Sequence, residues 1–383
     1  MFSSQIKAVI EYIRELYQTS DFIPLHEPKF FGNEKNYVID CLDSTFVSSV
    51  GKYVDQFEKK LADFTGAKYA VATINGTSAL HIALLMVGVN PDDEVITQPL
   101  SFVATCNAVS YCQAKPVFVD VDLDTLGMSP ESLDHYLVNN TKMTSKGCFS
   151  TFSGRRIAAV VPMHTFGNPC RILEISEICK KYEIPLVEDA AESLGSSYID
   201  RHTGTFGRVG VFSFNGNKTI TTGSGGMIVT DDEFLAKRAK HVTTTAKVPH
   251  AYEFVHDEIG FNYRLSNINA ALGCAQMENI SVILENKREI AKKYEQFFSG
   301  TGFTFLKETP NGKSNYWLNA LILNDQNERN IFLKELNQAG VMARPIWRLM
   351  NELTMFRDSY SSDLKNSKWL EERVVNIPSS AII

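Results

Sequence analysis

The chain has 383 residues and a formal net charge of −6 at neutral pH, with 44% hydrophobic and 21% charged residues. This composition is typical of a folded globular protein and excludes an intrinsically disordered chain. The acidic balance, without any run of lysine and arginine, excludes nucleic acid held by phosphate neutralisation as a partner. The length predicts one large domain and one smaller domain.

Neither a membrane segment nor a metal site is predicted. Residues 1–18 carry acidic side chains within an apolar periodicity, which predicts an amphipathic helix and not a signal peptide. No apolar run approaches the roughly 20 residues that span a bilayer. The seven cysteines are widely spaced and lack a zinc-binding pattern. We therefore expect reduced thiols, no metal and a cytoplasmic protein.

Between residues 68 and 232, short apolar runs alternate with segments of helical periodicity. The apolar runs predict strands at 68–74, 93–100, 115–122, 156–166, 184–191, 207–215 and 225–232. The periodic segments predict helices at 77–89, 102–112, 172–182 and 233–242. This alternation is typical of β-α-β units and of a mainly parallel sheet with both faces covered.

After about residue 265 the pattern changes to long helical segments. They occupy 268–298 and are followed by a strand at 315–323, a helix at 328–340 and a polar tail. We therefore predict an α/β fold of two domains joined at GFNYRLSN. The large domain, residues 1–260, would contain the mainly parallel sheet and the N-terminal helical segment, and residues 261–383 would form the smaller α+β domain.

Lys218 lies in SFNGNKTITTGSGG, a stretch with no other charged residue, directly after the apolar run GVFSF. Open α/β sheets carry their sites at the carboxyl ends of the strands. A buried lysine with few cations nearby can lose its charge and act as a nucleophile or a base. The alternative for this stretch alone is an ordinary loop lysine in solvent.

Carboxylates and small polar residues follow two other predicted strands. Asp189 and Glu192 end the strand IPLVEDAA or follow it. A strand-end aspartate could hold a pyridine nitrogen protonated, which makes that ring an electron sink, or could cap a helix. Gly76, Thr77 and Ser78 begin a predicted helix, where amide hydrogens and the helix dipole favour a phosphate. Simple helix capping is the alternative there as well.

Three other side chains are weaker candidates. Phe102 could stack on a cofactor ring or pack in the core. Ser213 could add a hydroxyl to a phosphate site or satisfy a strand end, and His164 could approach a cofactor or be a buried, hydrogen-bonded histidine. Two nucleotide motifs fail: Asn217 separates glycine from lysine in GNKT, and GSGG lacks the spacing of a dinucleotide loop.

Taken together, NGTSALHIAL, EDAAESLG, FSFNGNKTITTGSGGM and GFNYR resemble the sugar aminotransferases of the DegT/DnrJ/EryC1/StrS family over nearly the whole chain. The resemblance implies fold type I of the pyridoxal phosphate enzymes, with pyridoxamine phosphate formed between two half-reactions. It implies that Lys218 forms the Schiff base with the cofactor and that Asp189 pairs with the pyridine nitrogen. The implied phosphate and ring contacts are Gly76, Thr77, Ser78, Ser213 and, for stacking, Phe102. It also implies a homodimer with shared active sites, in which Asn262 reaches the cofactor phosphate from the partner subunit.

The chain departs from the family pattern at two places. Glu192 stands where many relatives carry histidine or glutamine, next to the cofactor hydroxyl. HVTTTAKVPH lacks an arginine and a His-Gly that are common in relatives, so Lys247 becomes a candidate substrate contact, with a solvent-facing loop lysine as the alternative. Arg264 could hold a carboxylate of the amino donor or form an interface salt bridge.

Stretches such as FIPLHEPKFFGNE and VPMHTFGNP are most similar to the clade of the legionaminic-acid and related cell-surface sugar pathways. That resemblance implies a UDP- or GDP-linked 4-keto-6-deoxy hexose, commonly a 2-acetamido sugar, converted to its 4-amino sugar with L-glutamate as donor. A 3-aminotransferase or a dehydratase-like member is one alternative, although the dehydratases carry histidine in place of Lys218. A catalytically silent regulatory or sugar-binding protein is the other.

Overall fold

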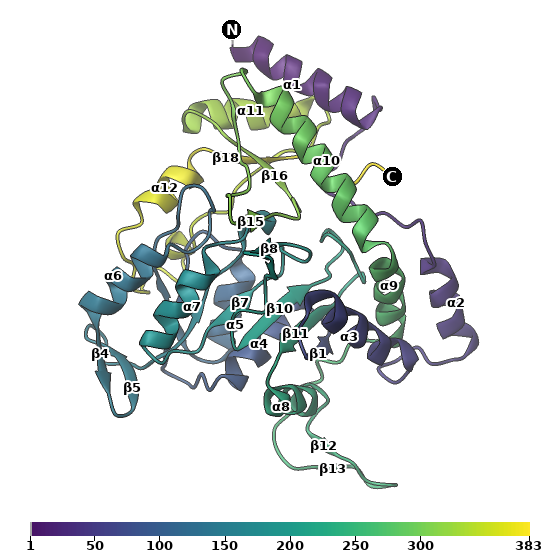
Figure 1. Cartoon of the computed structure of the whole chain (residues 1–383), viewed down its shortest axis with the longest axis vertical. Helices are drawn as coiled ribbons and strands as arrows, with labels where there is room; N and C mark the ends of the chain where they lie inside the picture. Colours follow the sequence, from purple (N-terminus) through teal and green to yellow (C-terminus); the bar gives the residue numbers. More distant parts are fainter. Residues whose placement is uncertain (1) are drawn as a thin grey trace.

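A mainly parallel sheet lies at the centre of the computed structural model, which describes residues 2–383 (Figure 1). Four of its strands pair in the order β1 (Tyr69–Thr73), β11 (Gly226–Thr230), β10 (Val209–Ser213) and β7 (Val187–Asp189). The remaining strands pair in the order β6 (Ile157–Val161), β2 (Glu94–Thr97) and β3 (Lys115–Phe118). Parallel bridges from Val160 to Leu186 and from Met163 to Asp189 join the two parts. The two strand pairs that include β11 are antiparallel, and the other pairs are parallel. The prediction of a mainly parallel sheet is therefore confirmed.

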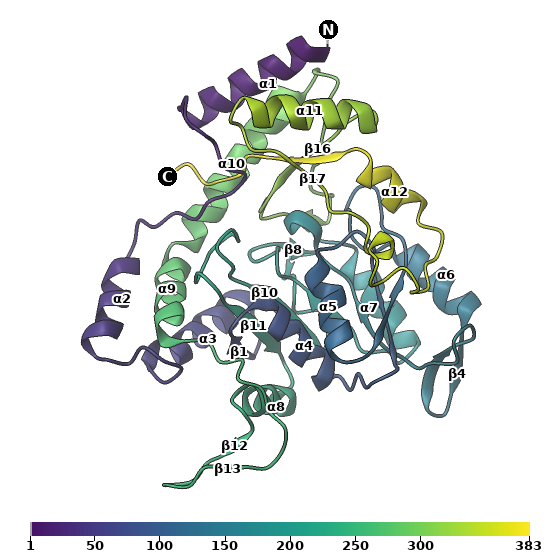
Figure 2. The same cartoon turned by 180° about the vertical axis from the view of Figure 1, so that it is seen from behind.

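Helices cover both faces of this sheet. One face carries α4 (Gly76–Met86), α5 (Val103–Tyr111) and α8 (Glu233–Thr243), which lie on the near side in Figure 2. The other face carries α3 (Lys52–Thr65), α6 (Pro130–Asn140), α7 (Ile172–Lys181) and α9 (Asn267–Glu278). Successive residues of β10 divide between the two cores, Val211 on the first face and Phe212 on the second. This burial on both faces explains the continuous apolar runs in the sequence.

The C-terminal part forms a second, antiparallel sheet. Its strands pair in the order β14 (Thr304–Phe305), β16 (Asn319–Ile322), β18 (Val374–Ile377) and β17 (Arg344–Pro345). The helices around it are α10 (Ile280–Phe298), α11 (Gln326–Gln338) and α12 (Lys365–Glu371). The prediction of a polar tail after residue 340 is therefore wrong, because β17, α12 and β18 lie there. The four residues of β18 are too few to show a periodic pattern.

The first helix, α1 (Phe2–Tyr17), packs on the C-terminal sheet (Figure 1). Its apolar residues Ile6, Val9 and Ile13 are buried in the same core as Tyr294 and Phe332. The helical segment after residue 265 is divided at Asn279 into α9, which packs on α3, and α10, which packs on α1. The division at residue 260 stays a prediction, and this packing favours placing α1 with the C-terminal part.

Short elements complete the fold. They are α2 (Glu34–Asp43), the 3-10 turns Thr165–Gly167 and Met350–Glu352, the sheet of β15 (Gly312–Lys313), β8 (Ser197–Tyr198) and β9 (Arg201–His202), and the hairpins β4 (Thr141–Thr144) with β5 (Gly147–Ser150) and β12 (Lys247–Val248) with β13 (Val255–His256). The β12–β13 hairpin projects from the bottom of the body in Figure 1. Among the helices of residues 2–383, none has both the length and the apolar composition needed to cross a bilayer.

Candidate active site

A cavity of about 800 Å³ lies between the carboxyl ends of the central strands and the C-terminal sheet. Its first wall consists of residues that end the strands β1, β2, β6, β7 and β10 or closely follow them. This is the edge at which open α/β sheets carry their ligands. The opposite wall is lined from the C-terminal part by Trp317, Leu318, Gln326, Arg329, Arg344–Arg348, Glu371 and Asn376.

Lys218 lies in the connection between β10 and β11 and lines this cavity. Its Nζ is 3.3 Å from Glu192 Oε1 and 4.0 Å from the centre of the Trp317 ring. Trp317 is held against the same connection because its Nε1 donates a hydrogen bond to the carbonyl of Asn217 at 2.6 Å. The Lys218 side chain is 13% exposed, which does not fit the alternative of an ordinary loop lysine in solvent.

Glu192 is the carboxyl partner of Lys218 and is buried. Burial raises the pKa of Glu192 to about 7, although Lys218 and the amide of Phe166 lower it. The Phe166 amide donates to Glu192 Oε2 at 2.9 Å, from a residue with the uncommon left-handed φ of 58°. Glu192 can therefore take up or release a proton near neutral pH beside the lysine.

Asp189 ends β7 and is buried at the cavity wall. Thr105 Oγ1 donates to its Oδ2 at 2.7 Å, and the Ala191 amide donates to its Oδ1 at 3.2 Å. Burial raises the pKa of Asp189, and the Thr105 hydroxyl, the Ala191 amide and Lys218 oppose that shift. A cationic group placed against this carboxylate would offset its desolvation.

The N-terminus of α4 forms the polar end of the first wall. Gly76 and Thr77 line the cavity together with Ser213 from the end of β10. A Cβ atom on Gly76 would lie 2.8 Å from the Ser213 Cβ, so the helix approaches the strand as closely as glycine allows. Ser78 does not line the cavity; its amide donates to Oδ1 of Asn75 at 2.8 Å, so the Asn75 side chain caps the helix.

Aromatic rings form the remainder of the wall near these groups. Phe102 lines the cavity directly before α5 and is half exposed. The Trp347 ring centre lies 5.0 Å from that of Phe166 and 6.3 Å from that of Phe102. The cavity thus offers flat apolar surfaces beside a lysine, two carboxyls and a helix N-terminus.

Known proteins resemble the chain over nearly its whole length. The family model of the DegT/DnrJ/EryC1/StrS aminotransferases matches residues 30–382. The chain belongs to this family. The GDP-perosamine synthase of Escherichia coli O157:H7 is 36% identical over 360 residues, which are 94% of this chain and 93% of that protein.

Two further comparisons agree with this membership of the DegT/DnrJ/EryC1/StrS family. The putative pyridoxal phosphate-dependent aminotransferase EpsN of Bacillus subtilis (strain 168) is 37% identical over 335 residues, 87% of this chain and 84% of that protein. Among solved structures, Helicobacter pylori PseC, an aminotransferase involved in pseudoaminic acid biosynthesis, is similar with a TM-score of 0.85 and 26% identity over 94% of both chains.

As a member of the family, the protein is an aminotransferase that uses pyridoxal phosphate, and its fold is that of the pyridoxal phosphate aminotransferases. The cavity fits this cofactor. The buried Asp189 carboxyl, whose pKa is raised by burial, would be stabilised by a protonated ring nitrogen. The N-terminus of α4 suits the phosphate, and Lys218 is the primary amine that a Schiff base requires.

Besides Ser78, four predicted site residues do not line the cavity of their own chain. His164 is fully buried, with its Nε2 3.1 Å from Glu188 Oε2, so the structure favours the alternative of a buried, hydrogen-bonded histidine. Lys247 lies on β12, and its Nζ is 4.1 Å from the ring centre of Phe254. Asn262 accepts a hydrogen bond from Arg264 Nε at 3.0 Å.

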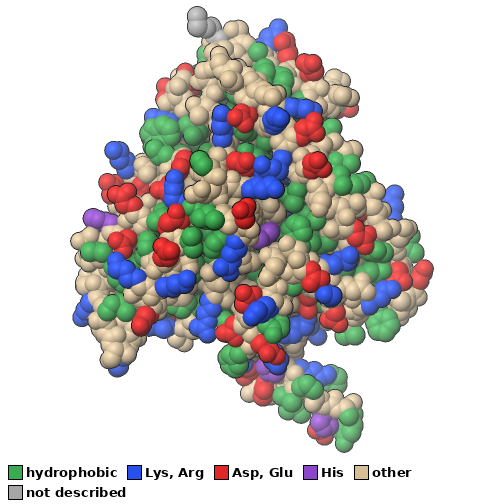
Figure 3. All heavy atoms as spheres, viewed as in Figure 1, with side chains coloured by type: hydrophobic (Ala, Val, Ile, Leu, Met, Phe, Trp, Pro, Cys, Tyr) green, Lys and Arg blue, Asp and Glu red, His purple; other side chains and the backbone are tan. Residues whose placement is uncertain are grey.

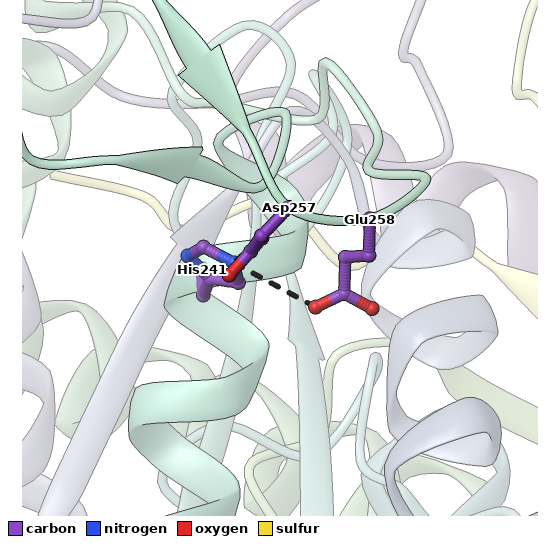
Figure 4. Close-up of side chains that lie close together, drawn as sticks. All are labelled: His241, Asp257 and Glu258. Carbon is purple, nitrogen blue, oxygen red and sulfur yellow. Dashed lines mark hydrogen bonds and ion pairs between the residues drawn. The ribbon is translucent and has the colours of Figure 1, made fainter.

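A polar cluster fixes the base of the hairpin that carries Lys247 (Figure 4). Nε2 of His241, at the end of α8, lies 2.7 Å from Oδ1 of Asp257 and 3.6 Å from Oε1 of Glu258. Both oxygens of Glu258 also pair with Arg238 of α8. These contacts join the base of the hairpin to α8.

Sequence reasoning missed Thr105 and the whole opposite wall. Thr105 lies one helical turn after Phe102, so its position on the same face of α5 was an available signal. Trp317 lies in the predicted strand 315–323, which does not by itself place the ring in a site. Arg344, Trp347 and Asn376 come from strands or turns that gave no periodic pattern. Their place at the site depends on how the second sheet packs against the first.

Proposed function

We propose that this family member is a nucleotide-sugar aminotransferase. It would move the amino group of L-glutamate to the keto carbon of a UDP- or GDP-linked 4-keto-6-deoxy hexose, commonly a 2-acetamido sugar, and so form a 4-amino sugar. The observation that carries the proposal is Lys218, which shares one cavity with Asp189 and Glu192. The similarity to a GDP-perosamine synthase supports a nucleotide sugar as substrate. The legionaminic-acid type of cell-surface pathway rests on the sequence stretches alone.

In this proposal Lys218 has two tasks. When bound, pyridoxal phosphate supplies a carbonyl carbon that condenses with amines and a ring that accepts electrons. Lys218 Nζ would hold the cofactor between turnovers, and the amine of glutamate would take its place there. The freed Nζ would take the proton from the α carbon of glutamate and return it to the cofactor. Water would then supply the keto oxygen of 2-oxoglutarate, which leaves while the amino group stays on the cofactor. In the second half-reaction it delivers a proton to C4 of the sugar.

The neighbouring carboxyls assist Lys218 in different ways. Asp189, fixed by the Thr105 hydroxyl, would keep the ring nitrogen protonated. Glu192, 3.3 Å from Nζ, would hold the proton that the lysine gives up when it becomes nucleophilic. The pKa of Glu192, about 7, is near that needed for such an exchange at neutral pH. Thr77 and Ser213 would hold the phosphate at the N-terminus of α4.

We also propose a homodimer with shared active sites. The β12–β13 hairpin exposes Tyr252 and Phe254 by 82% and 81%, and Ile259, three residues after the hairpin, is 88% exposed. Figure 3 shows the hairpin as a narrow projection at the bottom of the view, with green hydrophobic side chains. Apolar side chains gathered on a projection are typical of a surface that another chain covers. Asn262 would then reach the partner's cofactor phosphate, and Lys247 and Arg264 would face the partner's substrate.

Two alternatives compete with this proposal. A dehydratase-like member or a 3-aminotransferase would use the same cofactor, but the family's dehydratases carry histidine where this chain has Lys218. A catalytically silent regulatory or sugar-binding member would need no lysine or aspartate, and both residues line the cavity.

The experiment that tests the proposal is the visible spectrum of the protein with pyridoxal phosphate, before and after L-glutamate. A lysine-bound cofactor should give a visible band that Lys218→Ala lacks, and L-glutamate should bleach it. A band that glutamate leaves unchanged would contradict the donor. The absence of any band would contradict the function itself. Keto sugars linked to UDP and to GDP should then restore the band of the glutamate-treated enzyme, and the faster one identifies the nucleotide.

A further inference from the structure

An unpartnered amide lies in the cavity wall that the C-terminal sheet provides. Asn376 on β18 is 3% exposed and lines the cavity. Its side-chain nitrogen Nδ2 has no hydrogen-bond partner among residues 2–383. Buried polar groups nearly always have a partner, because an unmade hydrogen bond destabilises the fold. This amide is therefore free to donate a hydrogen bond to a ligand that carries an acceptor atom.

The strand pairing explains why the fold leaves this amide free. Along β18, Val375 and Ile377 point into the core shared with α1 and α10, so Asn376 points to the opposite face. Its partner across β16 is Ala320, whose methyl group offers no acceptor. Its partner across β17 is Arg344, which offers only donors.

Arg344 is a second unpaired donor on the same face of the sheet. Directly opposite residues of antiparallel strands point to the same side, with Cβ atoms about 4.5–5.5 Å apart. Arg344 lines the same cavity as Asn376 and takes part in none of the arginine ion pairs of residues 2–383. The other arginines of this wall differ, because Arg329 and Arg348 both face Glu371 and lower its pKa against the effect of burial.

We propose that Arg344 and Asn376 bind a carboxylate group of the amino donor. One guanidinium and one neutral amide match the single charge and the two oxygens of a carboxylate. A sugar diphosphate carries more charge, and Arg344 is the cation of this wall without a carboxyl neighbour. The inference rests on the proposed function and deepens it, because it makes the donor an amino acid bound by the C-terminal sheet.

The subsite serves one half-reaction and not the other. The donor occupies it while its amino group is transferred, and its keto acid leaves before the sugar enters. The hexose of the nucleotide sugar has no carboxylate to place there. Loss of Arg344 or of the Asn376 amide should therefore slow the reaction with L-glutamate and spare the reaction with the keto sugar.

Calorimetric titration of the cofactor-free protein with glutarate, a dicarboxylate without an amino group, tests the subsite directly. Arg344→Gln removes the cation, and the nearly isosteric Asn376→Asp replaces the amide donor by an acceptor. Each should weaken glutarate binding at least tenfold, whereas Arg357→Gln, which removes an exposed arginine outside the cavity, should not. The absence of glutarate binding, or equal binding by all variants, would overturn the proposal.

Titrations with UDP and GDP separate a carboxylate site from a diphosphate site. Both nucleotides should bind the wild type and the two variants equally. A loss of nucleotide affinity with unchanged glutarate affinity would assign the wall to the diphosphate and overturn the proposal. In the holoenzyme, the L-glutamate concentration for half-maximal bleaching should rise at least tenfold in Arg344→Gln. A protein that shows no visible band but binds glutarate as described would refute the proposed function and leave the subsite standing.

Discussion

Lys218 and Glu192 place an amine and a carboxyl side by side in the cavity wall, where both side chains are largely removed from water. Folding moves a carboxyl and an amine out of water and leaves them 3.3 Å apart, with an amide of Phe166 as the other polar neighbour of Glu192. For Glu192 the desolvation outweighs the attraction, since its pKa is raised to about 7. The protonated, neutral form of this carboxyl therefore persists to a higher pH than it would in water.

Glu192→Gln should change how stability depends on pH. The pKa of Glu192 rises from its ordinary value of 4.5 to about 7 on folding, so the folded protein binds this proton more tightly than the unfolded chain. The contribution of this proton to the free energy of unfolding is complete below pH 4.5 and is lost as pH rises through 7. Between pH 5 and pH 8 the wild type should lose up to about 3 kcal/mol of unfolding free energy relative to the variant, at about 1.4 kcal/mol for each pKa unit.

Urea unfolding of the cofactor-free proteins at both pH values measures this difference. Glu285→Gln, which changes an exposed carboxyl on α10, is the matched control and should follow the wild type. Parallel pH dependence of wild type and Glu192→Gln would show that the carboxyl is not desolvated as described.

Thr105→Val should weaken cofactor binding through Asp189. The valine keeps the shape of threonine but removes the 2.7 Å hydrogen bond to Asp189 Oδ2. A hydrogen bond to a charged group contributes about 1.5–3 kcal/mol, so the affinity for pyridoxal phosphate should fall about tenfold or more. Ser110→Ala on the same helix removes a hydroxyl that bonds only a helix carbonyl and serves as the control in absorbance titrations. Equal affinities would show that Thr105 does not support the carboxylate.

At the scale of elements, the junction of α4 with β10 forms the end of the cavity at which we propose that the cofactor phosphate binds. Gly76→Ala would normally stabilise a helix, because alanine has the higher helix propensity. Here the new Cβ would lie 2.8 Å from the Ser213 Cβ, so the helix must move off the strand. Unfolding free energy should fall by about 1–3 kcal/mol, and phosphate contacts should weaken.

The sign of that change distinguishes a packed junction from a loose one. Gly216→Ala, where a Cβ meets nothing within 4 Å, should stay within about 0.5 kcal/mol of wild type in thermal or urea unfolding. A stabilised Gly76→Ala protein would contradict the close approach of α4 to β10.

The sequence predicts the first wall of the site better than the second for a physical reason. Lys218 and Phe102 follow predicted strands and Asp189 lies near the end of one, and parallel strands bring their carboxyl ends to one edge. Trp317 and Asn376 reach the same cavity only because the antiparallel sheet packs over that edge. No local sequence pattern specifies such packing. In addition, β18 has only four residues, one of them a buried asparagine, so the sequence does not predict this strand.

At the scale of the whole molecule, the cavity lies between the two sheets, and the hairpin that bears Lys247 points away from it. Because each sheet provides one wall of the cavity, one chain could hold a cofactor on one wall and a second ligand on the other. The hairpin and Asn262, which do not contribute to their own chain's cavity, have no role at the site unless a second copy of the chain is present.

Mixed dimers test that arrangement. If Asn262 acts in the partner's site, Asn262→Ala and Lys218→Ala should each reduce transamination severely when alone. A heterodimer of the two variants contains one site with Lys218 and a partner Asn262 intact and one site with both missing. Random reassortment of equal amounts should therefore restore about a quarter of the wild-type activity, since half of the dimers are mixed and each has one good site. Activity that stays at the level of the separate variants would contradict the sharing of the site and place Asn262 in its own chain's site.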